Sequence, residues 1–106
     1  MTPGFRLAAA LLLTGFLSAP AFAQSDTSAT YKSKCAPCHG ADGQANTQVG
    51  KALKAASFKT PSIVKASDAD LFAVVKSGKG KMPAWNGKLT DDEIKALVAF
   101  IRTLQK

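Results

Sequence analysis

The strongest pattern of apolar and polar positions lies close to the C-terminus. Apolar residues recur there at the spacing of one helix face, with Phe100 beside the stripe: Ile94, Leu97, Val98, Ile101 and Leu104. The four residues before this stripe, Thr90-Asp91-Asp92-Glu93, read as a capping box with negative charge in the first turn. The pattern therefore predicts a C-terminal helix that buries one face.

A second apolar stripe predicts another helix in the middle of the chain. Leu71, Val74 and Val75 follow at helical spacing after Ser67, which can cap the helix. Gly78 can end that helix. Residues 79–87 are punctuated by glycine and proline, so we expect a loop between the two helices.

The segments nearer the N-terminus give weaker signals. Residues 24–29 are polar and expected to be loose, whereas residues 30–35 can form a short helix. Residues 40–50 read as a loop, and residues 51–56 could make a helical turn before Pro61 interrupts it. Since no segment alternates like an exposed strand, the sequence predicts one small all-α domain.

The first 23 residues have the organisation of an export signal. Arg6 is followed by an uncharged run over residues 7–17, and Ala21-Phe22-Ala23 has the small-x-small form that a signal peptidase cuts after. The competing interpretations are an uncleaved membrane anchor and a buried helix. A bilayer asks for about 20 apolar residues, and this run is short. We expect cleavage near Ala23-Gln24, an exported or periplasmic protein, and a mature domain of residues 24–106.

Size and charge narrow the classes of function. The chain has 106 residues and a formal net charge of +7, and losing residues 1–23 removes only the charge of Arg6. A domain this small usually needs a disulfide, a metal or a cofactor to be stable. Two cysteines allow at most one disulfide, so a bound cofactor fits better. Nucleic acid is a poor candidate for the partner of an exported protein without a recognition motif.

The candidate chemistry is concentrated in Cys35-Ala36-Pro37-Cys38-His39, which has the spacing of c-type haem attachment. Two thiols about a turn apart can each add to one haem vinyl group and form two thioethers. His39 would then lie beneath the ring and could place an imidazole nitrogen on the iron. The motif predicts one covalently attached haem c, with His39 as the proximal ligand.

Other interpretations of the Cys-x-x-Cys spacing fit less well. A thioredoxin-like redox pair requires a βαβ context, which the sequence lacks. A structural zinc site requires four ligands, but the chain contains two cysteines and one histidine. A plain disulfide between Cys35 and Cys38 suits an oxidising compartment, but it leaves His39 unexplained. A haem-free exported module with that disulfide stays as an alternative.

Met82 is the candidate for the second axial ligand of the iron. Beyond the predicted signal it is the only methionine, and its loop of glycine and proline is a poor place for a core residue. An open iron, or one bound by a nearby lysine (Lys76, Lys79 or Lys81), is the alternative. Histidine and methionine together fill both axial positions and raise the reduction potential. We therefore expect a one-electron carrier and not an enzyme. The rivals are a small haem peroxidase and the haem partner of a larger oxidoreductase.

These motifs resemble those of a small class I c-type cytochrome, the short bacterial form with one haem. The resemblance covers the attachment motif at Cys35, Cys38 and His39, the ligand loop Met82-Pro83-Ala84-Trp85, and Gly50 with Leu53 where the family often has Gly-Pro-x-Leu. It also covers Tyr31, Leu97 and Phe100, which match residues where the first and last helices cross. The resemblance implies a small cytochrome c fold, with three or more helices around one haem whose edge is exposed.

One position departs from the family pattern. Lys51 stands where the family has a proline whose backbone carbonyl orients the proximal histidine. The carbonyl of Lys51 is still available for this hydrogen bond, which would fix the tautomer of His39. The sequence alone does not assign the acceptor.

Two groups of lysines could surround an exposed haem edge. One group precedes Met82 and the other lies in the loop after residue 50: Lys76, Lys79, Lys81, Lys51, Lys54 and Lys59. Such a basic ring would steer a monomeric carrier to redox protein partners with an acidic docking face. The alternative is a solvated surface that keeps the protein soluble. Trp85 could pack on the haem, hydrogen-bond a propionate, or fill the core.

Overall fold

The computed structural model describes residue 4, residues 14–15 and residues 22–106. The predicted signal of residues 1–23 lies for the most part outside these described residues, so its cleavage stays a prediction. Among the residues that the structure describes, no helix is long and apolar enough to span a bilayer.

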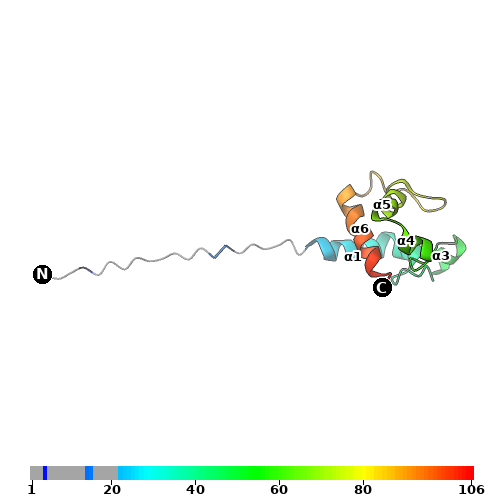
Figure 1. Cartoon of the computed structure of the whole chain (residues 1–106), viewed down its shortest axis with the longest axis horizontal. Coiled ribbons are helices and arrows are strands. Elements are labelled where there is room, and N and C mark those ends of the chain that lie inside the picture. Colours follow the sequence, from blue (N-terminus) through cyan, green and yellow to red (C-terminus); the bar gives the residue numbers. More distant parts are fainter. Residues whose placement is uncertain (1–3, 5–13, 16–21) are drawn as a thin grey trace.

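The described chain is all-α, as the sequence predicts, and Figure 1 shows its helices gathered into one body. The helices run in this order: α1 Phe22–Lys34, α2 Ala36–His39, α3 Gln48–Ala52, α4 Pro61–Lys65, α5 Asp68–Ser77 and α6 Asp91–Thr103. Between residues 22 and 106 there is no strand, only two isolated bridges that pair Lys79 with Met82 and Asn86 with Leu89.

The two apolar stripes of the sequence form the two helices that they predict, α5 and α6. The Thr90 hydroxyl accepts from the Glu93 amide at 3.1 Å, and the Glu93 carboxylate accepts from the Thr90 amide at 3.2 Å, which completes the capping box of α6. Ser67 caps α5 by accepting from the Asp70 amide, and Gly78 ends that helix with a φ of 77°. Local capping and apolar spacing were therefore sufficient to define these two helices.

Two expectations for the N-terminal half are wrong. Residues 24–29 are not loose, because α1 begins at Phe22. Their side chains Asp26 and Thr27 lie beside Asp92 of α6, so tertiary packing extends a helix whose sequence gives little apolar signal. The helical turn expected at residues 51–56 lies earlier, as α3, because Thr47 caps it by accepting from the Gly50 amide.

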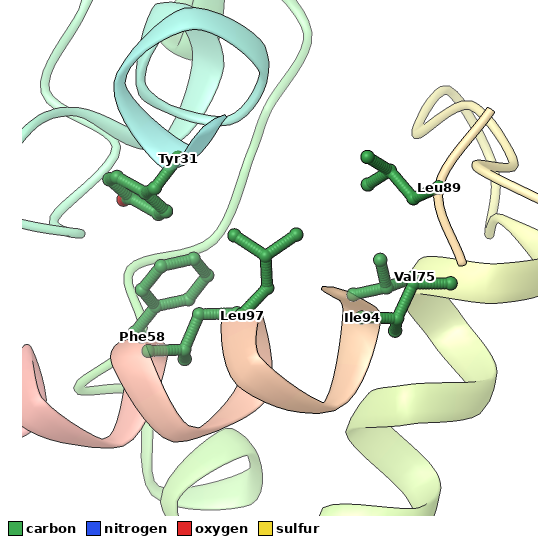
Figure 2. Close-up of a cluster of buried hydrophobic side chains, with 7 residues drawn as sticks. Tyr31, Phe58, Val75, Leu89, Ile94 and Leu97 are labelled. Carbon is green, nitrogen blue, oxygen red and sulfur yellow. The ribbon is translucent and has the colours of Figure 1, made fainter. Parts of the chain in front are cut away.

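The core forms where α1 crosses α6 and α5 packs beside them. Tyr31, Ile94 and Leu97 are its most completely buried side chains. Figure 2 shows Tyr31 of α1 above Phe58 and Leu97, with Val75 of α5 next to Ile94. The Tyr31 and Phe100 rings lie 4.9 Å apart, which confirms the predicted helix crossing. This crossing forms one wall of the site described next.

Candidate functional site

An open cavity of about 880 Å³ is lined by α2, α4, α5, α6 and the loops that follow α3 and α5. Its lining includes all four residues that the sequence singles out: Cys35, Cys38, His39 and Met82. Most of the remaining wall is apolar and includes Phe58, Ile63, Leu71, Val74 and Leu97. The fold therefore brings the Cys-x-x-Cys-His motif and the methionine loop, which are far apart in the sequence, to one apolar cavity.

Cys35 and Cys38 are free, half-buried thiols at the start of α2. The amide of Cys35 donates to the carbonyl of Tyr31, so the end of α1 runs directly into the motif. Burial raises the pKa of the Cys35 thiol to about 11, so this sulfur is protonated at neutral pH. The two sulfurs are not joined to each other in this structure and both line the cavity.

The His39 imidazole lies against Phe58, with ring centroids 4.7 Å apart and planes 26° from parallel. Burial lowers the pKa of His39 and keeps the ring neutral, which is the form that binds a metal. The backbone of Ala56 approaches the ring and opposes this shift. It does not complete a hydrogen bond, because Nδ1 is buried with no partner among the described residues.

The carbonyl of Lys51, which the sequence left open as one possible partner of His39, makes other hydrogen bonds. It accepts hydrogen bonds from the amides of Leu53 and Lys54 at the end of α3. The backbone that reaches the imidazole belongs to Ala56 instead. The reason is that α3 ends with a reversal at Lys54, which brings the following residues back toward His39.

Residues 40–50 hold the backbone of the motif in place. The amide of Ala45 donates to the His39 carbonyl at 2.7 Å, and the Thr47 hydroxyl donates to the Pro37 carbonyl at 2.8 Å. Gly50 packs so closely that a Cβ there would overlap the carbonyl oxygen of Cys38. The loop thus braces the cysteines and the histidine from the side away from the cavity.

Met82 is half-buried and packs against the edge of the core. Its loop makes a tight turn in which the Met82 amide donates to the Lys79 carbonyl at 2.9 Å. Gly78 allows this loop to approach, because a Cβ at that position would meet the Met82 carbonyl at 2.8 Å. The Trp85 amide then donates to the Val75 carbonyl, which fixes the loop to the end of α5.

Trp85 also lines the cavity and stands between two ammonium groups. The Nζ atoms of Lys34 and Lys88 lie 5.3 and 5.4 Å from its ring centroid, within the range of cation–π attraction. The residues that line the cavity include four lysines: Lys34, Lys54, Lys79 and Lys81. Three of these belong to the groups predicted to surround the site. Lys76 instead pairs with Asp91 at 3.1 Å.

Sequence reasoning missed several contributors to the site. Phe58, Lys34 and the backbone of Ala56 carry no motif, since their roles depend on tertiary contact with His39 or Trp85. Asp70, in the first turn of α5, also lines the cavity, and no sequence pattern pointed to it as a site residue. Gly50 was not missed, since the sequence analysis names it with Leu53, but only the structure shows its close approach to the Cys38 carbonyl.

The residues of this cavity fit a bound porphyrin. The cavity volume and apolar wall match those of cofactor sites, in which few polar groups fix the orientation. Two free thiols stand ready for covalent attachment, and His39 supplies a neutral imidazole. Met82 adds the single thioether sulfur of the lining.

Comparisons with known proteins agree with this reading of the site. Residues 14–101 match the family model of cytochrome c oxidase, cbb3-type, subunit III. Cytochrome c6 of Synechococcus sp. is 32% identical over 91 residues, which cover 84% of this chain and 79% of that protein. The cbb3-type cytochrome c oxidase subunit CcoP of Azospirillum brasilense is 34% identical over 76 residues, 70% of this chain.

The chain covers different shares of the lengths of these relatives. It covers only 26% of the length of the Azospirillum oxidase subunit. The solved structure of the KustC0563 c-type cytochrome superposes with a TM-score of 0.69 at 33% identity, over 76% of this chain and 98% of that one. The fold therefore corresponds to a whole small protein in that case and to one part of the oxidase subunit.

Proposed function

Because the chain belongs to the family of monohaem c-type cytochrome domains, we propose that it holds one haem c in the cavity and shuttles single electrons between redox proteins. Membership of this family makes it an electron-transfer protein of the cytochrome c class. The observation that carries the proposal is the convergence of Cys35, Cys38, His39 and Met82 on one apolar cavity. The family itself implies covalent haem c.

Each of the four residues has a distinct role in this proposal. Cys35 and Cys38 hold the porphyrin by thioethers to its two vinyl groups, which ties the cofactor to the junction of α1 and α2. His39 would bind the iron through Nε2, because Nδ1 is buried within the protein. Met82 binds it from the other side through sulfur.

The chain's own groups determine what the site can do. The bound haem iron supplies a reversible one-electron change between its ferric and ferrous states. With His39 and Met82 filling both axial positions, no site is left for oxygen or peroxide, which favours a carrier over a peroxidase. The stacking of Phe58 on His39 and the binding of the methionine loop to α5 hold both ligands in place. The apolar wall excludes water and favours the less charged, reduced state.

The basic rim supports a proposal for partners and location. Lys34, Lys54, Lys79 and Lys81 line the cavity, so positive charge surrounds the route by which an electron would enter or leave. We propose docking to an acidic face of redox proteins, with the carrier acting as a monomer. The signal pattern of residues 1–23 supports export to the periplasm, with cleavage near Ala23-Gln24.

Replacement of Met82 tests the axial ligation. In Met82→Ala we expect the reduction potential to fall and the reduced protein to bind carbon monoxide, since the sulfur no longer occupies the sixth position. Met82→Leu keeps most of the side-chain volume and should behave in the same way, which separates loss of sulfur from loss of packing. Lys81→Ala, the neighbouring control, should not bind carbon monoxide. Unchanged potential and ligand binding in both Met82 variants would show that Met82 is not the ligand.

A further inference from the structure

The end of α3 places a lysine in a backbone conformation that favours glycine. The Lys54 amide donates to the Lys51 carbonyl at 3.2 Å, and the Ala55 amide donates to the Gly50 carbonyl at 2.8 Å. This pair of bonds is the Schellman motif, and its reversing residue is Lys54, with a φ of 56°. Glycine is the usual residue at such a position because it has no Cβ to strain.

The strain at Lys54 is not explained by packing. Within residues 22–106, Ala45 is the other residue besides glycine that has a positive φ. Ala45 is buried, so its side chain gains packing contacts that glycine would not make. Lys54 is exposed, and its backbone bonds would form equally well with glycine. Residues in such conformations cluster at functional sites, where the side chain has a role that compensates for the strain.

The surroundings of Lys54 indicate what that role is. Lys54 lines the cavity, and it lies two residues before Ala56, whose backbone reaches His39. The charged residues that line the cavity are Lys34, Lys54, Lys79, Lys81 and Asp70. Lys34 is engaged with Trp85 and is next to Cys35, one of the two residues that would attach the porphyrin. Lys79 and Lys81 belong to the methionine loop. Lys54 is thus the charged residue that the chain reversal at the end of α3 places at the cavity, close in sequence to the backbone that reaches His39.

We propose that Lys54 is a cofactor-binding residue whose ammonium group pairs with a carboxylate of the haem, one of the two propionates at the rim of the porphyrin. The inference rests on the proposed haem site, since propionates are the anionic groups that haem brings to the cavity. A cation beside a carboxylate favours its ionised form and offsets its negative charge. A positive charge near the iron also disfavours the oxidised state, which carries one more positive charge than the reduced state.

Potentiometry of the isolated holoprotein as a function of pH tests this assignment. In Lys54→Gln we expect a lower reduction potential, and the step in potential that marks propionate ionisation should move to higher pH. Lys51→Gln makes the same change of charge at an exposed position of α3 and is the control. It should shift the reduction potential less and leave the pH of the propionate step unchanged. Lys54→Gly should lower the potential as Lys54→Gln does, and it should unfold at an equal or higher denaturant concentration because the strain is relieved.

The results that would contradict the pairing can be told apart from those that would contradict the haem site. Equal potentials and equal pH steps for Lys54→Gln and Lys51→Gln would overturn the pairing with a propionate. The assignment would also be wrong if the isolated protein were unaffected and only the reaction with an acidic partner slowed, since Lys54 would then contact a carboxylate of the partner. A purified protein without a haem c spectrum would refute the proposed function itself, before Lys54 is considered.

Discussion

A hydrogen bond from the Tyr31 hydroxyl links the core to the attachment motif. Its ring is fully buried between α1 and α6, and its hydroxyl donates to the Gly40 carbonyl at 2.6 Å, directly after His39. The sequence indicated only a packing role, because no local pattern reveals the acceptor of a hydroxyl group. Burial raises the pKa of Tyr31 far above its usual range, so the neutral phenol is strongly favoured in the folded protein.

We predict that Tyr31→Phe destabilises the protein by about 1 kcal/mol at neutral pH. The ring contacts survive and one buried hydrogen bond is lost. Because the folded pKa is raised, the contribution of Tyr31 to stability is present below the unfolded pKa of about 10 and is lost as pH rises above it. Urea unfolding at several pH values should show a steeper alkaline loss of stability in wild type than in Tyr31→Phe. Parallel curves would contradict this assignment.

Gly50 is the second residue whose identity matters to the site. Gly50→Ala should cost about 1–3 kcal/mol, because the new Cβ collides with the backbone carbonyl of Cys38 and cannot be accommodated by moving a flexible side chain. The displaced motif should also retain less haem after export. Gln48→Ala, an exposed change on the same helix, is the control and should be nearly neutral. Unfolding midpoints and haem content of the purified variants measure both effects.

At the scale of elements, local signals predicted some helices and not others. Helices α5 and α6 carry their own caps and apolar stripes, so the sequence predicts them with their ends. The first turns of α1 lack such a stripe and are helical through contact with α6. The short α2 and α4 are single turns whose stability comes from the structures that they join, so their sequences carry no helical period.

Arg102 attaches α4 and α5 to the end of α6. Its guanidinium donates to Asp68 at 2.9 Å and to the carbonyls of Val64 at 3.3 Å and Ala66 at 2.5 Å. This contact supports one wall of the cavity, since Ile63 and Ala66 are among its lining residues. No sequence motif predicts this contact of Arg102, because most of its hydrogen-bond acceptors are backbone carbonyls of another segment.

We predict that Arg102→Lys destabilises the protein by about 1.5–3 kcal/mol, although the charge is kept. An ammonium group cannot reach the three acceptors that the planar fork of arginine serves. Asp68→Asn removes only an exposed ion pair and should cost less than about 1 kcal/mol. Chemical denaturation of the two variants compares these losses. Equal effects would mean that the ion pair, and not the carbonyl contacts, holds α4.

At the scale of the whole molecule, the sequence could predict the chemistry of the site but not its wall. Cys35, Cys38 and His39 are contiguous, so their spacing alone indicates the attachment of a cofactor. The wall draws on α4, α5 and α6 and on Phe58, and only the fold shows that these segments meet. Likewise, the sequence suggested two groups of basic residues, whereas the structure brings Lys54, Lys79 and Lys81 to one cavity with Lys34.

The basic rim predicts how the holoprotein reacts with charged redox reagents. Oxidation of the reduced protein by anionic hexacyanoferrate should slow as salt is added, whereas oxidation by a cationic cobalt complex should accelerate. Lys81→Glu should reduce the rate with hexacyanoferrate about tenfold at low salt. Lys65→Glu is the matched control, at an exposed position of α4 that does not line the cavity, and should have a smaller effect. Equal rates for the two variants in stopped-flow measurements would place electron exchange elsewhere on the surface.

The central claim is that this cavity holds a covalent haem c ligated by His39 and Met82. The most direct test is an optical spectrum of protein exported from a host with c-haem maturation, recorded oxidised and then reduced. We predict sharp c-type bands in the reduced protein and the weak far-red sulfur-to-iron band in the oxidised protein. A high-spin spectrum would contradict ligation by Met82, and a protein without haem absorption would contradict the account as a whole.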